Sequence, residues 1–211
     1  MKFQAYTFLF SAILMSLMSC ASSYRPIQPE RMPYTNLTSN GDVALGYRYE
    51  VLGETRNKKY AKKELKNGVK VVAVSVTNNS AKPLTFGTDL KLMSGEKELL
   101  AMSPSSSFKA LKQNTPIYLL YGLLTFVKLR IEKKKYSYVE VNEYRVGLVL
   151  GPTITIGNLA VASGANKKFK TELISRDMWG KVIEPGKTVY GLVSLSGSGF
   201  EALSIKVVGS N

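Results

Sequence analysis

The pattern of hydrophobic and polar positions divides the chain into two β-rich ends and a long, mostly uncharged middle. Residues 69–77 form a β-branched run in which Val72, Val74 and Val76 alternate with smaller side chains, which indicates a strand. Further short strand-like runs cover residues 45–52, 84–86, 90–93, 98–102, 188–195 and 200–208. Because turns rich in Gly, Pro and Asn join most of these runs, the pattern predicts a mainly β, antiparallel β-sandwich over residues 45–211.

The middle, residues 104–180, does not fit a minimal sandwich and predicts an apolar, partly helical insertion. A short helix capped by its serines is expected at 104–113, and a second helix at 154–176, with Asn158, Ala162 and Asn166 on one stripe. The lysine-rich stretch 54–67, in contrast, is expected to be an exposed loop, with at most a helical turn. The remaining expectations for the middle are an apolar segment at 116–129, a charged stretch at 130–135, a strand at 136–141 and an uncharged segment at 146–163.

Three interpretations of this insertion stay open: packing onto the sandwich core, which leads, a partner or self-association surface, and membrane contact. The uncharged segment 146–163 is long enough for a membrane span, and Gly147 and Gly151 have a helix-packing spacing. Pro152 and Asn158 argue against a span. The candidate residues for contact with a partner or a membrane are apolar and aromatic: Tyr118, Leu119, Tyr121, Leu123, Leu124 and Phe126.

The N-terminus has the order of a secretory signal: Lys2, an apolar run, and small residues before Cys20. Residues 17–20, Leu-Met-Ser-Cys, resemble the lipobox of bacterial lipoproteins. By that resemblance, residues 1–19 are a signal peptide, and Cys20 becomes the acylated N-terminus with a diacylglyceryl thioether and acyl chains such as palmitate. An ordinary signal with an incidental cysteine is the alternative.

The residues after Cys20 indicate in which membrane such a lipoprotein would reside. Cys20 is followed by Ala21, Ser22 and Ser23, without aspartate or an acidic run. In the lipoproteins it resembles, this favours the outer membrane, facing the periplasm. Residues 20–44 carry three prolines among polar residues, so we expect the lipidated cysteine and a flexible tether there.

Composition excludes several classes of chemistry. The chain has no histidine and one cysteine, so it has neither an imidazole base nor imidazole ligands for zinc or copper. Ser106 and Lys109 have the Ser-x-x-Lys spacing of penicillin-binding enzymes, but the partner motifs are absent. We therefore expect a protein that is not an enzyme, with no catalytic residue, no metal and no cofactor except the covalent lipid.

The net charge of +14 comes from clusters of lysine and arginine. Behind a secretion signal, the available polyanions are phospholipid headgroups and lipopolysaccharide, so we expect no nucleic acid partner. Solvated lysines without a ligand are the simpler interpretation. The candidate anion contacts are seven lysines: Lys58, Lys59, Lys62, Lys63, Lys133, Lys134 and Lys135.

Two motifs resemble a protein family. Residues 74–84 (VSVTNNSAKPL) and 183–193 (IEPGKTVYGLV) resemble the strands near the two ends of small immunoglobulin-like envelope lipoproteins of the Bacteroidetes type, whose function is unknown. The resemblance implies a fold and no activity. We expect a non-enzymatic, lipid-anchored envelope protein that binds or supports a protein or envelope partner. The alternative is a membrane- or lipopolysaccharide-contacting module that uses the apolar insertion and the lysine clusters.

Overall fold

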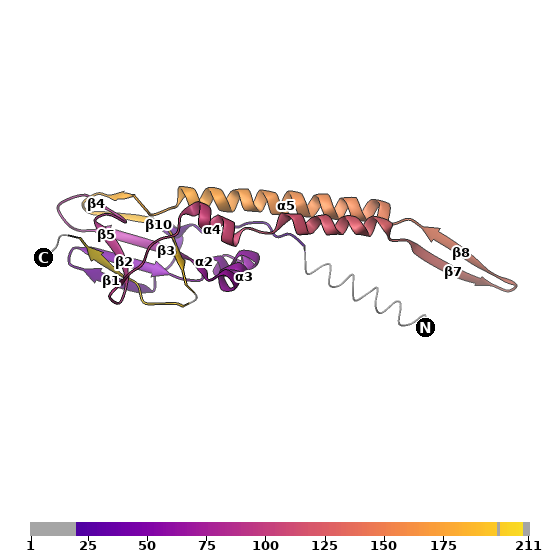
Figure 1. The fold of residues 1–211 in the computed structure, drawn as a ribbon, viewed down its shortest axis with the longest axis horizontal. Coiled ribbons are helices and arrows are strands. Elements are labelled where there is room, and N and C mark those ends of the chain that lie inside the picture. Colours follow the sequence, from indigo (N-terminus) through magenta and orange to yellow (C-terminus); the bar gives the residue numbers. More distant parts are fainter. Residues whose placement is uncertain (1–19, 198, 209–211) are drawn as a thin grey trace. The chain divides into compact units, whose positions relative to one another are not determined.

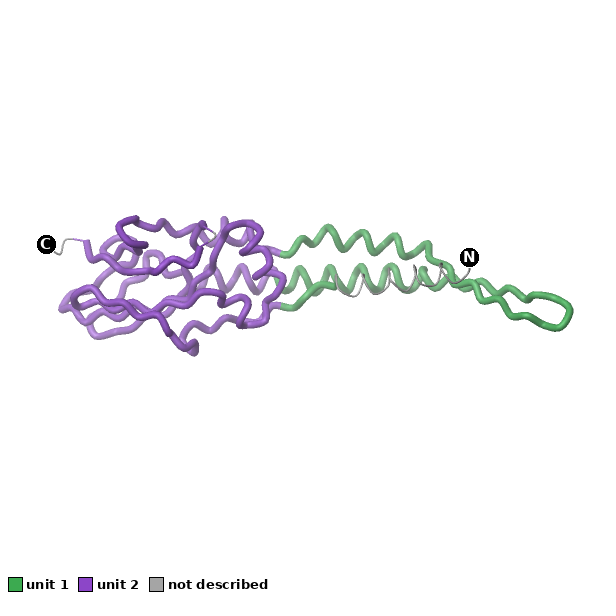
Figure 2. The backbone as a smooth tube through the Cα atoms, turned by 90° about the horizontal axis from the view of Figure 1, so that it is seen from below, with its two compact units in different colours: residues 1–23, 113–165 green, residues 24–112, 166–211 purple. Residues whose placement is uncertain are grey.

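The computed structural model describes residues 20–197 and 199–208 (Figure 1), so the predicted signal peptide, residues 1–19, lies outside the described residues. The chain forms two compact units, coloured separately in Figure 2. Unit 1 comprises Met1–Ser23 and Gln113–Ala165, and unit 2 comprises residues 24–112 and 166–211. The segment that forms unit 1 is shorter than the predicted insertion of 104–180, because 104–112 and 166–180 belong to unit 2.

Unit 2 contains several antiparallel sheets. Its largest sheet has the order β1 (Asn36–Asn40), β2 (Val43–Arg48), β3 (Val69–Asn78) and β10 (Lys187–Ser196). A second sheet has the order β11 (Ser204–Val207), β5 (Leu90–Ser94) and β6 (Lys97–Glu98), and β4 (Leu84–Thr85) pairs with β9 (Val182–Ile183). The fold is therefore β-rich, although helix, at about 35%, is as frequent as strand, at about 34%.

One hydrophobic core joins the sheets of unit 2. Val72, Val74 and Val76 of β3 are buried in it, together with Leu92 of β5 and Ile205 of β11. On the other face of β3, Val71 and Ala73 are buried too, because α2 (Val51–Glu54), α3 (Lys58–Asn67) and the 3-10 helix η1 (Pro29–Arg31) pack on that strand, whereas Ser75 and Thr77 are half-buried. The strand β3 is thus the centre of unit 2, as a continuous β-branched run predicts for a strand covered on both faces.

The helices of unit 2 are α2 (Val51–Glu54), α3 (Lys58–Asn67) and α4 (Pro104–Leu111). The predicted exposed loop at 54–67 is wrong, because Tyr60 and Glu64, four residues apart, give α3 one buried face. The predicted helix at 104–113 is confirmed as α4, whose first turn is capped where the Ser106 amide donates to Ser103 Oγ at 3.3 Å.

The predicted flexible tether is wrong from Tyr24 onward. Tyr24 and Ile27 are buried, and both bind Glu172: the Tyr24 hydroxyl donates to Oε2 at 2.6 Å, and the Ile27 amide donates to Oε1 at 2.9 Å. The Tyr24 ring also packs against Phe169, with 5.2 Å between ring centroids. Two apolar side chains among polar neighbours have no periodicity, which is why the sequence pattern did not reveal them.

Unit 1 consists of a pair of helices joined by a β-hairpin. The 3-10 helix η2 (Thr115–Phe126) leads into β7 (Leu129–Lys135) and β8 (Tyr138–Tyr144), and α5 (Gly147–Ser175) follows. Both views show η2 alongside the first part of α5 (Figures 1 and 2). The helix α5 begins seven residues before the predicted 154, and the charged stretch 130–135 is a strand.

Glycines allow this close approach of η2 and α5. A Cβ atom at Gly147 would meet the carbonyl oxygen of Leu124, and one at Gly151 would meet Thr125. Twelve residues of 3-10 helix are an unusually long run, since such helices rarely exceed a few residues. We define the helical pair as η2 together with residues 147–165 of α5.

We predict that Glu172→Gln lowers the free energy of unfolding of unit 2 by about 1–3 kcal/mol, because the half-buried carboxylate that accepts two hydrogen bonds loses its charge and one acceptor oxygen. The amide hydrogen of Ile27 should exchange faster in this variant, as measured by hydrogen exchange alongside chemical denaturation. Glu184→Gln, at an exposed position, is the control and should change neither. Unchanged exchange at Ile27 would show that residues 24–27 are held by something else.

Candidate functional site

The helical pair exposes a large apolar surface to solvent. Leu119, Leu123 and Phe126 of η2 are 59%, 65% and 81% exposed. The exposed apolar residues of the pair, which we call the apolar surface, are Ile117, Leu119, Leu120, Leu123, Phe126, Leu148, Val149, Leu150, Ile156 and Val161. These residues are exposed, so the leading expectation of core packing is wrong for them, and many exposed apolar residues on one pair of helices favour contact with a partner or a membrane.

The predicted contact residues divide into three groups. Leu119, Leu123 and Phe126 lie on the apolar surface, while Tyr121 and Leu124 are half-buried. Tyr118 is only 3% exposed, stacks on Tyr121 and donates from its hydroxyl to Gln113 Oε1 at 3.4 Å. The prediction of Tyr118 as a contact residue is therefore wrong, because that side chain fills the interior of unit 1.

The helical pair carries no charge. Residues 113–127 and 146–166 contain no Asp, Glu, Lys or Arg, whereas Lys112, Lys128, Arg145 and Lys167 follow directly at their ends. Among the described residues, α5 is the helix whose length and composition would allow it to cross a membrane, and 28% of its apolar window is buried. From residue 147 to 165 the helix rises about 27 Å, close to the roughly 30 Å of a hydrocarbon core.

The structure holds the residues after Cys20 against the helical pair. The Ala21 amide donates to Asn158 Oδ1 at 2.6 Å, and Asn158 is itself buried. The Ser22 amide donates to Gln113 Oε1 at 3.3 Å, and Gln113 Nε2 returns a bond to the Ser22 carbonyl at 2.7 Å. Cys20, which is exposed, therefore lies beside the helical pair within unit 1.

Asn158 and Gln113 are the positioning residues that sequence reasoning missed. In the sequence, Asn158 lies on one helical stripe with Ala162 and Asn166 and argues against a membrane span; the structure shows that all three residues are buried. The signal that the sequence offered was an amide side chain within an otherwise apolar run. Its partner could not be identified, because it lies 137 residues away.

The hairpin β7–β8 carries the predicted Lys133, Lys134 and Lys135, all of them exposed. Residues 128–145 hold six basic and three acidic residues, a net charge of +3. Each glutamate approaches a basic side chain: Glu143 lies 3.8 Å from Lys128, Glu132 lies 3.8 Å from Arg130, and Glu140 lies 3.1 Å from Lys135. The hairpin thus neutralises about half of its own positive charge.

The other predicted lysines lie on α3, in unit 2. Lys58 and Lys62 are exposed, and Lys59 and Lys63 are half-buried. Within residues 20–197 and 199–208, no acidic side chain forms an ion pair with Lys58, Lys62, Lys63 or Lys66. Burial lowers the pKa of Lys63, and the positive charges of Lys66 and Lys112 lower it further. These four lysines therefore differ from the hairpin lysines in having no ion pair with an acidic side chain among the described residues.

Glu64 does not neutralise the α3 lysines, because its side chain turns inward. Its Oε1 accepts the Val71 amide at 2.7 Å, and burial raises the pKa of the carboxyl to about 7 despite this bond and the nearby Lys70.

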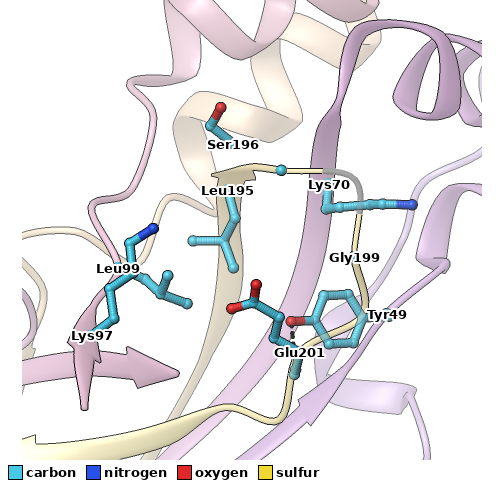
Figure 3. A pocket seen from close by; sticks show the side chains of 9 residues that line it. Tyr49, Lys70, Lys97, Leu99, Leu195, Ser196, Gly199 and Glu201 are labelled. Atoms are coloured by element: carbon cyan, nitrogen blue, oxygen red, sulfur yellow. Dashed lines mark hydrogen bonds between the residues drawn. The ribbon is translucent and has the colours of Figure 1, made fainter. Parts of the chain in front are cut away.

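Unit 2 also has a pocket of about 290 Å³, lined by Tyr49, Lys70, Lys97, Leu99, Leu195 and Glu201 among others (Figure 3). Figure 3 shows the Lys70 amine pointing away from Leu99, Leu195 and Glu201, and this amine lies 4.0 Å from the ring centroid of Phe200. We assign no reaction to this pocket. Among the described residues, no group of three His, Cys, Asp or Glu side chains could hold a metal ion.

No protein family, curated protein or solved structure matches this chain. The resemblance to immunoglobulin-like envelope lipoproteins thus stays a prediction from the sequence. The functional assignment depends on the apolar surface and the position of Cys20.

We predict that the stability of unit 2 depends on pH through Glu64. The pKa rises from 4.5 to about 7 on folding, so its stabilising contribution is complete below pH 4.5 and is lost as the pH rises to 7. Between these values, the free energy of unfolding should fall by about 3 kcal/mol more in the unmodified protein than in Glu64→Gln. Denaturant titrations at several pH values measure this difference, and parallel profiles would contradict it.

We predict that Asn158→Ala frees the segment that follows Cys20. Loss of one hydrogen bond of about 1 kcal/mol should make the Ala21 amide exchange roughly fivefold faster. Asn114→Ala, an exposed position in the same unit, should leave this exchange rate unchanged. Equal exchange rates in the two variants would rule out Asn158 as the residue that holds Ala21.

Proposed function

We propose that this protein is a non-enzymatic lipoprotein of the bacterial cell envelope, anchored through Cys20, whose helical pair contacts the membrane that holds the anchor. The observation that carries the proposal is the hydrogen bond between the Ala21 amide and Asn158, because it keeps the acylation site next to the apolar surface. Acyl chains on Cys20 and the apolar surface would then enter the same lipid layer.

The energetics favour a lipid environment for the apolar surface. Each leucine moved from water into an apolar medium contributes about 1.5–3 kcal/mol. No charged side chain within the helical pair has to be dehydrated in that transfer. The lysines and arginines that flank the uncharged segments can extend to the headgroups.

The sheets of unit 2 support an immunoglobulin-like sandwich as the proposed fold. In that fold, strand B pairs with A and E in one sheet, and strand C pairs with F in the other. If β2, β3, β5, β10 and β11 correspond to A, B, C, E and F, each of these pairs is present: β2 with β3, β3 with β10, and β5 with β11. The shared core between the sheets agrees with this arrangement.

The proposed location is the outer membrane, facing the periplasm. Support for it comes from the sequence alone, since Ala21, Ser22 and Ser23 lack the acidic residue expected of inner-membrane retention. The anchoring lipid is the only non-protein group that the proposal requires.

A second candidate function, binding of a protein partner, is favoured by the hairpin β7–β8. All seven residues of β7 are exposed, and β8 is the only strand paired with it among the described residues. A two-stranded hairpin is only marginally stable in water, so a partner would stabilise this one.

We predict that the helical pair binds membranes even without the lipid. With residues 1–19 removed and Cys20→Ser, the protein should float with anionic liposomes, and adding Leu119→Asp and Leu123→Asp should abolish flotation. Losing two leucines of about 1.5–3 kcal/mol each lowers partitioning at least a hundredfold.

The matched control is Leu37→Asp with Leu100→Asp in unit 2, since these leucines are 73% and 72% exposed. This control should float like the Cys20→Ser parent. If the parent stays at the bottom and forms a defined oligomer in solution, membrane contact is wrong and the protein-binding function takes its place.

A further inference from the structure

The segment that follows Cys20 also binds the start of helix α3. The Arg25 amide donates to Asn57 Oδ1 at 2.9 Å, and Asn57 Nδ2 donates back to the Arg25 carbonyl at 2.8 Å. Asn57 immediately precedes α3 and is 1% exposed. This two-way bond fixes the backbone of Arg25 to the first turn of the lysine-rich helix.

The length of the chain limits how far α3 can be from the anchor. Cys20 and Arg25 are five residues apart, which a fully extended chain spans in at most about 18 Å. Since acyl chains keep Cys20 at the membrane interface, the first turn of α3 has to remain close to the headgroups of the same leaflet. A flexible tether of residues 20–44 would have imposed no such limit.

The side of α3 away from the core is suited to an anionic surface. Lys58, Lys62 and Lys66 are exposed and follow at intervals of four residues, so they lie along one side of the helix. We call these three residues the lysine face. Exposed Arg25 and Arg56 add two charges at the start of α3.

Three acidic groups around α3 bind other partners. Glu64 turns inward to the Val71 amide, Glu54 pairs with Arg48 at 2.7 Å, and Glu172 binds Tyr24 and Ile27. A fourth, Glu50, lines a pocket with Ala61 and Leu65 of α3 but forms no ion pair with the lysine face within the described part of the chain. The hairpin lysines, in contrast, have acidic neighbours on their own strands.

We infer that the lysine face, with Arg25 and Arg56, docks onto the phosphate headgroups of anionic phospholipids in the leaflet that carries the Cys20 lipid. This inference rests on the proposed function, since it requires the acylated anchor. Docking would hold unit 2 at the membrane surface, and it would weaken as salt screens the charges.

The test uses the full lipidated protein with a single added cysteine, Leu65→Cys, labelled with a fluorophore. Leu65 lies on α3 and is 70% exposed, and Cys20 is blocked by its lipid. The protein is placed in vesicles of phosphatidylcholine, with or without phosphatidylglycerol, that carry a headgroup quencher. We expect quenching that requires phosphatidylglycerol and is lost at high salt.

The variants compare equal changes of charge at two places. Lys62→Glu with Lys66→Glu should strongly reduce the quenching, because each lost lysine lowers the ratio of docked to undocked protein about fivefold. Lys133→Glu with Lys134→Glu on the hairpin changes the net charge equally and should leave the quenching unchanged.

Three results would overturn the inference. If the protein floats with the vesicles but the label is not quenched, the docking inference is wrong, while the proposed function is unaffected. If both double variants lose quenching equally, net charge and not the lysine face determines binding, and the inference is wrong. Failure of the lipidated protein to float would overturn both the inference and the proposed function.

Discussion

The functional picture depends on how firmly the short segment after Cys20 is held. Within unit 1, Asn158 and Gln113 bind the backbone of Ala21 and Ser22. Within unit 2, Glu172 and Asn57 bind Tyr24, Arg25 and Ile27. Each of these side chains satisfies a backbone group or a buried hydroxyl, which would be costly to leave unpaired. A segment that would otherwise be a linker therefore holds Cys20, the proposed acylation site, against folded structure, and both membrane proposals depend on that constraint.

The second constraint on function is that the exposed apolar side chains of the uncharged helical pair need a covering. Its buried stripe, which includes Gly147, Gly151 and Asn158, is used for packing, and many of the remaining positions are apolar and exposed. A helix that is apolar on all sides is normally covered by protein or by lipid. If Cys20 carries the proposed lipid anchor, lipid is the covering that requires no further component.

The β-strands were the most predictable part of the sequence, because β3 and β10 show runs of β-branched residues between clear turns. The helix α3 was missed since its apolar positions, Tyr60 and Leu65, are few among the lysines, and its buried face includes the carboxylate Glu64. For the helical pair, the sequence indicated an apolar segment but could not distinguish a protein core from a lipid-facing surface. A protein core and a lipid-facing surface are built from the same apolar residue types. Only the structure distinguishes them here, because Leu119 and Leu123 are exposed whereas Tyr118 is buried.

For the lysine clusters too, the sequence alone could not show the environment of the side chains. In the sequence, Lys58–Lys59 and Lys133–Lys135 look equivalent, since both are short basic runs near turns. The antiparallel pairing of β7 with β8 places Glu140 opposite Lys133 and within 3.1 Å of Lys135. The buried face of α3, in contrast, directs its one carboxylate away from the lysines. The pairing of strands and the side of a helix that is buried thus give two basic runs that look alike in the sequence different acidic surroundings.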